Sequence, residues 1–282
     1  MKHNLRVTSI LIILFLMSHV LGLFVIKHYL PKEENLPLGI QKPEFEERTS
    51  YIPIIIAIFA ATVIALVLIK FAAFRIWKLW YLASIFITLI ISFNAFIPEM
   101  IALFLAIIFS LLKTFRNGIL IHNFTEIFVY GGLAAIFVPV LSVWSIFVLL
   151  VLISIYDVIA VWKTRHMISM AKFQIKSKIF AGLFVPYSTK VLSKGLTKKG
   201  QYGKEIKVNE AVLGGGDIAF PLMFSGVMLK IFGFSAAIIT SFTAALALAI
   251  LFFIAKKKKF YPAMPFITTG SLTGYFIVLL LF

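Results

Sequence analysis

The sequence contains no cysteine, only two aspartates and few charged residues of any kind. Without cysteine the chain can form no disulfide, no thiolate nucleophile and no cysteine-ligated zinc or iron–sulfur site. Charged residues make up 13% of its 282 residues, which is too little to cover the surface of a water-soluble domain of this length. A soluble fold is therefore excluded, and any chemistry must come from other side chains.

Apolar and basic residues are what the sequence has in abundance. Apolar residues account for 61% of the chain, the mean hydropathy is +1.04, and 27 Lys and Arg stand against 11 Asp and Glu. A net charge of +16 can indicate a nucleic-acid partner. Here the basic residues fall in short blocks between long apolar runs, which is the pattern of a protein that crosses a membrane. We therefore expect no nucleic-acid partner.

Nine apolar stretches have about the length that a membrane crossing requires. A helix needs about 20 mostly apolar residues to cross a hydrocarbon core of about 30 Å. The fourth stretch is short and follows a break at Pro98 and Glu99, so eight spans remain an alternative. The sequence predicts an all-α polytopic membrane protein, a bundle of nine transmembrane helices. The nine stretches are residues 7–26, 51–69, 79–97, 100–112, 119–138, 143–162, 211–229, 234–255 and 263–282.

The distribution of basic residues predicts the orientation of these spans. With alternating spans, most Lys and Arg fall on the side of the N-terminus, including those of a polar segment at 163–210 and of the block at 256–259. Most acidic loop residues outside that segment fall on the other side. By the positive-inside rule, the N-terminus is cytoplasmic and the C-terminus lies outside. We interpret the first span as retained, because its apolar run is long and no clear cleavage site follows it.

The polar segment at 163–210 is the longest loop. Residues 165–180 place apolar side chains on one helical face and basic ones around the rest, which predicts a helix lying on anionic headgroups. A solvated basic loop is the alternative. Residues 204–208 alternate polar and apolar side chains and could form a short strand.

Both aspartates, Asp157 and Asp217, lie inside apolar runs, where a carboxyl group is costly and therefore a functional candidate. Their distances in sequence from Lys163 and Glu210 place them about 9 to 10 Å below the same membrane face, at 1.5 Å per helical residue. Two carboxyl groups that meet at one depth share a proton and can together polarise a peptide carbonyl and activate water. The aspartates alone leave three roles open: proteolysis, proton-coupled transport and separate structural hydrogen bonds.

Two further motifs lie near the aspartates. Gly214, Gly215 and Gly216 directly precede Asp217, and three glycines weaken a helix and let another backbone come close. The stretch 262–265, Pro-Ala-Met-Pro, begins the ninth span, and its prolines predict an extended segment that can bind an unfolded peptide. Close helix packing through small residues and a helix begun by proline are the ordinary alternatives.

Together, the motifs at 156–157, 214–217 and 262–265 resemble the YD, GxGD and PAL signatures of the presenilin and signal peptide peptidase family of intramembrane aspartyl proteases. The resemblance covers residues 156–265 by motif and the whole chain by its count of spans. Met264 is a departure, because the family has Leu there. The orientation is similar to that of presenilin rather than to the inverted signal peptide peptidases. The small size is similar to that of single-chain archaeal or bacterial-type members.

The resemblance implies a protease that cleaves within transmembrane helices, in one transmembrane domain with a scaffold at 1–142 and a catalytic part at 143–282. It implies that Asp157 and Asp217 are the catalytic pair, one as general base on water and the other as acid on the carbonyl oxygen, with the assignment left open. It implies no cofactor and no metal. The residues implied to shape the site and hold the unwound substrate as an added strand are Tyr156, Gly214, Gly215, Gly216, Pro262, Ala263, Met264 and Pro265.

The expected partners are the transmembrane helices of substrate proteins and the lipid bilayer, with no accessory subunit required and the oligomeric state open. The expected location is the cell membrane of a prokaryote, with the motifs near its cytoplasmic side. A proton-coupled transporter or cation channel with the Asp pair as relay is the competing function, and a scaffold without catalysis is the third. Glu126, with His122 one turn earlier, is a second polar site, interpreted as a structural pair or as part of a proton path.

Overall fold

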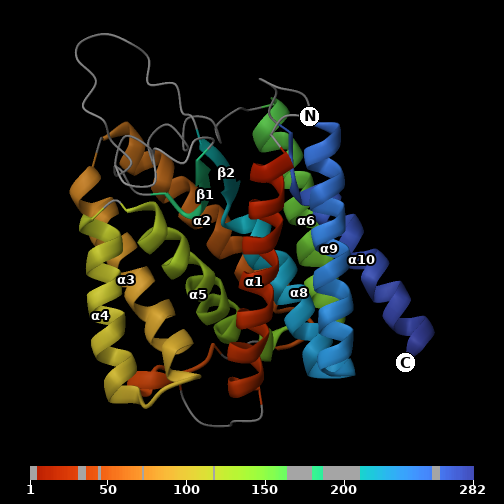
Figure 1. Cartoon of the computed structure of the whole chain (residues 1–282), viewed down its shortest axis with the longest axis horizontal. Helices are drawn as coiled ribbons and strands as arrows, with labels where there is room; N and C mark the ends of the chain where they lie inside the picture. Colours follow the sequence, from red (N-terminus) through yellow and green to blue (C-terminus); the bar gives the residue numbers. More distant parts are fainter. Residues whose placement is uncertain are drawn as a thin grey trace.

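The structure is a computed structural model that describes residues 5–30, 36–43, 46–71, 73–116, 118–163, 180–186, 210–255 and 261–282. Within these residues each of the nine predicted stretches overlaps one α-helix, and α3 begins five residues before its predicted stretch (Figure 1). The helices are α1 (Leu5–Tyr29), α2 (Tyr51–Lys70), α3 (Phe74–Asn94), α4 (Glu99–Phe115), α5 (Ile119–Phe137), α6 (Val143–Val158), α8 (Gly216–Phe232), α9 (Phe234–Ile254) and α10 (Met264–Leu281).

Proline, glycine and serine set several helix boundaries. Pro98 directly precedes the first residue of α4, and its missing N–H removes no helical hydrogen bond there. Ser142 caps α6, because its side chain accepts a hydrogen bond from the backbone N–H of Ser145. Gly233 separates α8 from α9 with φ of 89°, a conformation that glycine adopts without steric cost.

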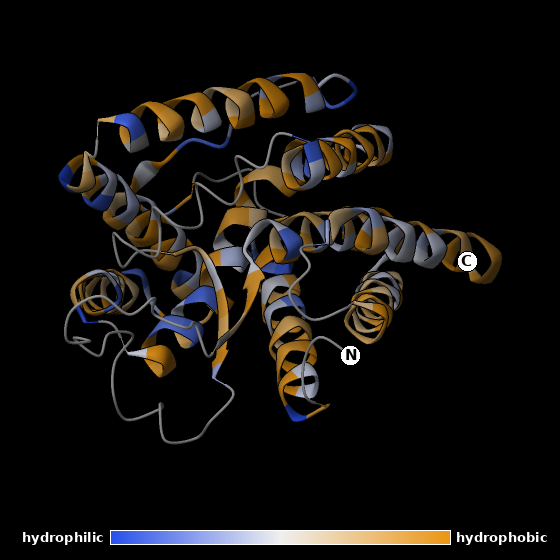
Figure 2. Cartoon of the chain, turned by 90° about the horizontal axis from the view of Figure 1, so that it is seen from above, coloured by the Kyte–Doolittle hydropathy of each residue, from blue (hydrophilic) through white to orange (hydrophobic). Residues whose placement is uncertain are grey.

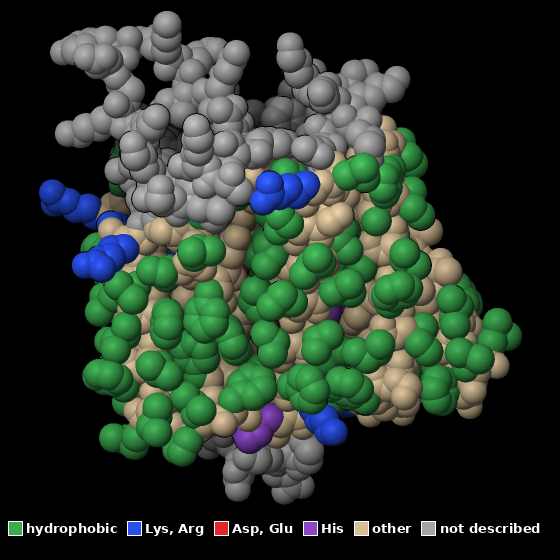
Figure 3. Space-filling model, in the orientation of Figure 1, with side chains coloured by type: hydrophobic (Ala, Val, Ile, Leu, Met, Phe, Trp, Pro, Cys, Tyr) green, Lys and Arg blue, Asp and Glu red, His purple; other side chains and the backbone are tan. Residues whose placement is uncertain are grey.

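Seven of the described helices, all but α4 and α8, are long and apolar enough to cross a membrane. The helices α4 and α8 have 17 residues each, just short of the length of a full crossing. Hydrophilic residues are confined to short patches along helices that are otherwise apolar (Figure 2). Apolar side chains cover the middle of the face seen in Figure 3, and its Lys and Arg side chains lie near the upper and lower edges. The chain is a multi-pass membrane protein.

Helix α1 packs between two groups of helices (Figure 1). On one side it contacts α5, which packs against α3 and α4, and on the other it contacts α8 and α9. Fully buried Phe15 and Phe224 belong to the larger of two apolar clusters in the described residues, which also includes side chains of α5, α6 and α10. Helix α2 is the most exposed, and it packs on α6 and α3. Helix α8, which carries Asp217, is buried along most of its length, and α6, which carries Asp157, packs against it.

A two-stranded antiparallel sheet stands at the end of the bundle near the N-terminus (Figure 1). Strand β1 (Gly182–Pro186) pairs with β2 (Glu210–Gly214), with Gly182 opposite Gly214. The prediction that the seventh span begins at residue 211 is wrong, because the apolar residues of β2 pair with β1 and α8 begins only at Gly216. The expected strand at 204–208 and all but the last residue of the expected helix at 165–180 lie outside the described residues.

Candidate active site

Asp157 lies in the last turn of α6 with 7% of its surface exposed. The backbone N–H of Met264 donates a hydrogen bond of 3.1 Å to its Oδ2. One turn before Asp157, the hydroxyls of Ser154 and Thr268 lie 2.8 Å apart and join α6 to α10. Beyond Asp157 the chain widens into a π-helical turn, η3 (Ile159–Lys163), a distortion that is frequent at functional sites.

Asp217 lies in the first turn of α8, directly after β2. The backbone N–H of Gly214 donates to its carboxylate. A Cβ atom on Gly214 would lie 3.2 Å from Oδ2 of Asp217, which is tighter than an ordinary contact. The backbone N–H of Gly215 donates to Ala181 O at 3.1 Å and so extends the pairing of the two strands. Glycine at position 214 therefore lets the strand end close against the aspartate.

The fold places the two aspartates on neighbouring helices. Helices α6 and α8 pack against each other, and the carboxyl of Asp157 acts electrostatically on that of Asp217. The two aspartates are separated by 60 positions in the sequence, and the helices that carry them are neighbours. The helical rise that placed Asp217 at the depth of Asp157 does not apply to residues 210–214, because they form β2. Such a pair can hold one proton between two carboxyl groups, which is the state that acid–base hydrolysis of a peptide requires.

The stretch 262–265 reaches the same site in a different conformation from the one predicted. Pro262 and Ala263 precede α10 without regular structure, but Met264 and Pro265 form its first turn. The expectation that proline holds Met264 extended is wrong. The N–H groups of a first helical turn have no intrahelical acceptor, so Pro265 costs no bond there and the N–H of Met264 is available to Asp157.

Tyr156 contacts helix α2. Its ring lies edge-on to that of Phe59 at 5.8 Å between centroids, and its hydroxyl lies 3.4 Å from Oγ1 of Thr62. Tyr156 therefore joins the helix of Asp157 to the exposed helix α2.

Helix α5 carries a cluster of polar residues that contact β1 and Lys113. Only His122 and Glu126 of this cluster were identified from the sequence. Nε2 of His122 lies 2.8 Å from Gly182 O, and Asn123 bonds to the backbone of β1. The principal partner of Glu126 is Lys113, at 2.7 Å, while Nε2 of His122 lies 3.8 Å from Glu126. Asn123 and Lys113 were missed. The recurrence of His122, Glu126 and Tyr130 at intervals of four residues, one helical face, was the signal that could have found this group.

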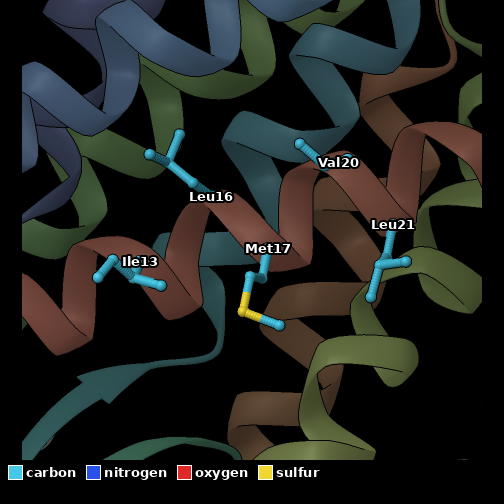
Figure 4. A pocket seen from close by; sticks show the side chains of 5 residues that line it. All are labelled: Ile13, Leu16, Met17, Val20 and Leu21. Atoms are coloured by element: carbon cyan, nitrogen blue, oxygen red, sulfur yellow. The ribbon is translucent and has the colours of Figure 1, made fainter.

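A hollow on the outer side of α1 lies apart from the aspartates. Five apolar side chains line it, so it offers contact to acyl chains and no group for hydrolysis (Figure 4). They are Ile13, Leu16, Met17, Val20 and Leu21.

Comparison with known proteins agrees with the fold. The profile of the family described as "Signal-peptide peptidase, presenilin aspartyl protease" matches residues 12–282. The chain is similar to two solved structures of a presenilin family intramembrane aspartate protease. The one in space group C222 has 17% identity and a TM-score of 0.65, with 98% of this chain and 99% of that chain covered. The one in space group P2 has 16% identity and a TM-score of 0.64, with 96% and 97% covered. No curated protein matches.

The polytopic helical fold and the family profile together define the class of intramembrane aspartyl proteases. Because the family profile spans nearly the whole chain, this protein belongs to the signal-peptide peptidase and presenilin aspartyl protease family. It is a hydrolase that acts within the membrane. Family membership favours proteolysis over the competing transporter interpretation.

Proposed function

We propose that Asp157 and Asp217 are the catalytic pair of this protease. One carboxylate takes a proton from water as the water attacks the scissile carbonyl carbon, and the other carboxyl group donates its proton to the carbonyl oxygen. The tetrahedral intermediate then collapses: the aspartic acid that took the proton from water gives it to the nitrogen, the C–N bond breaks, and a hydroxyl of the intermediate returns a proton to the other aspartate. The two residues titrate as one unit, so the acid and base roles belong to the pair.

The hydrogen bond from Met264 to Asp157 carries this proposal. It joins the proline-containing stretch to the first aspartate, while Gly214 joins β2 to the second. These two bonds, together with the packing of α6 on α8, support one site for all three motifs. A fixed N–H donor orients a carboxylate, and fixed orientation is what an acid–base pair needs to act on a bound peptide.

We infer that the substrates are transmembrane helices of other proteins and that they unwind before cleavage. A helical carbonyl is hydrogen bonded within its own helix, so its carbon is poorly placed for attack. Among the described residues β2 pairs with β1 alone, and its outer edge can accept a peptide as an added strand. The sequence predicted that an extended segment at 262–265 binds the unwound substrate. We propose instead that the β2 edge and the non-helical residues 261–263 bind it.

We also propose that the N-terminus and the β-sheet lie on the cytoplasmic side and the C-terminus outside, in the cell membrane of a prokaryote. The helix ends near the sheet carry basic residues, among them Arg75, Lys78 and Arg116, while Glu47 and Glu99 lie at the opposite ends of their helices. The catalytic part at 143–282 contains all three motifs. We propose that it acts without accessory subunits.

The test is cleavage of a single-span peptide by the purified protein in lipid vesicles. Asp157→Asn and Asp217→Asn are each expected to lower kcat by about 10²- to 10⁴-fold, because each removes one half of the acid–base pair. The double variant is expected to be little worse than either single variant, since the residues act as a unit. Thermal melting in detergent verifies that each variant is folded. Cleavage by a folded single variant at the wild-type rate would refute the proposal.

A further inference from the structure

Strand β1 is bound along the edge that faces away from β2. Nδ2 of Asn123 in α5 donates to Phe184 O at 2.7 Å, and the backbone N–H of Phe184 donates to Oδ1 of Asn123 at 2.9 Å. Phe184 is buried, with 5% of its surface exposed, so an unpaired N–H and C=O there would be costly. One amide side chain thus provides both the donor and the acceptor that a third strand would supply.

His122, the preceding residue of α5, binds the same edge two residues earlier. Its Nε2 lies 2.8 Å from Gly182 O, and because a carbonyl only accepts, Nε2–H is the donor. Gly182 and Phe184 are alternate residues of β1, so their backbone groups face the same side of the strand. The two side chains therefore fix both the position and the register of β1 on α5.

A buried ion pair holds the turn of α5 that presents these side chains. The side chains of Lys113 and Glu126 are 0% and 1% exposed, and their charged atoms lie 2.7 Å apart. Nζ of Lys113 also lies 3.0 Å from Oγ1 of Thr125 and 3.4 Å from His122 O. Charges at this depth in a membrane protein require such partners. The cluster ties the end of α4 to the start of α5 and leaves His122 little freedom.

The position of β1 also fixes the backbone just before Asp217, because β1 is hydrogen bonded to it. Gly182 lies opposite Gly214, and the N–H of Gly215 donates to Ala181 O at 3.1 Å. Tyr130, four residues after Glu126 on α5, packs against Gly215. A Cβ atom on Gly215 would lie 3.1 Å from the Tyr130 hydroxyl. Gly216, the last residue of this turn, directly precedes Asp217.

We propose that Asn123 and His122 are positioning residues for the catalytic reaction. They hold β1, and through it the turn at 214–216, where the carboxyl of Asp217 meets that of Asp157. This inference rests on the proposed catalytic role of the two aspartates. A displacement of about 1 Å at a reacting group can cost about 10²-fold in rate. Asn123→Ala is therefore expected to lower kcat by about 10- to 100-fold. KM is expected to change less than about threefold, because Asn123 lies across β1 from β2.

The experiment measures kcat and KM of the full chain in lipid vesicles with a single-span peptide, beside amide hydrogen exchange of residues 180–186. Asn94→Ala is the matched control, because Asn94 also loses one side-chain contact, to the Tyr29 hydroxyl at 3.2 Å, but on α3 away from the sheet. Asn123→Ala is expected to speed exchange over 180–186 and to lower kcat, while Asn94→Ala does neither.

A second pair of variants keeps the inference falsifiable where Asn123→Ala fails to fold. His122→Gln retains an N–H donor near Gly182 O and is expected to keep at least about ten times the kcat of His122→Leu, which lacks it. Equal kcat for these two variants would overturn the inference. So would an Asn123→Ala protein with faster exchange and unchanged kcat, or with a raised KM alone. Full activity of Asp157→Asn or Asp217→Asn would instead overturn the proposed function, which separates the two failures.

Discussion

The backbone N–H of Met264 donates a hydrogen bond of 3.1 Å to Oδ2 of Asp157, across 107 positions of the sequence. The contact uses the main chain, so its strength depends on the placement of α10 more than on the identity of the side chain. Met264 itself is buried, with 3% of its surface exposed. The difference from the family's leucine at this position therefore leaves the donor in place.

This relationship predicts different outcomes for two substitutions of Met264. Met264→Leu retains the N–H and conserves volume, so it is expected to cost less than about 1.5 kcal/mol in stability. Met264→Pro removes the N–H, and we expect kcat to fall at least about tenfold below that of the Leu variant, since a charge-assisted bond contributes about 1.5–3 kcal/mol. Peptide cleavage and thermal melting measure the two effects. Equal kcat values for the Leu and Pro variants would show that the bond has no role.

The glycines before Asp217 are expected to respond differently to alanine. A Cβ on Gly214 would lie 3.2 Å from Oδ2 of Asp217, so Gly214→Ala displaces the carboxylate and is expected to lower kcat by about tenfold or more. Gly216 is exposed, and its Cβ would lie 3.5 Å from the Phe220 ring, an ordinary contact. Gly216→Ala is therefore expected to fold normally, and a loss in its activity is expected in KM, where an approaching substrate backbone meets the new methyl group. A lower kcat for Gly216→Ala with unchanged KM would contradict this division.

The buried ion pair between Lys113 and Glu126 gives a prediction about stability. Lys113→Met leaves the carboxylate of Glu126 buried without its cation and is expected to cost about 3–5 kcal/mol. Adding Glu126→Met removes the stranded charge, so the double variant is expected to recover most of that loss. Denaturation in mixed micelles measures the free energy of unfolding for each variant. Additive losses in the double variant would show that the two side chains do not depend on each other.

At the opposite end of the bundle, Lys230 is expected to matter more than its acidic partner. Lys230 lies 2.8 Å from Glu47 Oε1, but it also donates to Pro139 O at 2.8 Å beyond the end of α5. The Glu47 side chain is 59% exposed, so Glu47→Gln is expected to change stability by less than about 1 kcal/mol. Lys230→Met leaves a carbonyl without its donor and is expected to cost about 1–3 kcal/mol. Melting temperatures of the two variants test this order.

The number and limits of most helices follow from the sequence because membrane crossing imposes a local requirement. About 20 apolar residues must occur in a row, and each such run can be found without knowledge of its neighbours. The seventh run is the exception, because residues 211–214 are as apolar as a helix but pair with β1 instead. A short apolar strand and the start of an apolar helix have the same composition, so only the partner strand distinguishes them.

The sequence by itself determined that the protein crosses the membrane many times, and it marked its two aspartates, which lie inside apolar runs, as functional candidates. Apolar length and the cost of a buried carboxyl group fix both conclusions residue by residue. Only the tertiary structure decided that Met264 binds Asp157 through its backbone, and that Asn123 and His122 hold β1, the partner of the strand leading to Asp217. These contacts join residues more than 50 positions apart through single polar atoms. Composition and periodicity do not predict such contacts, because the packing of the helices determines which residues meet.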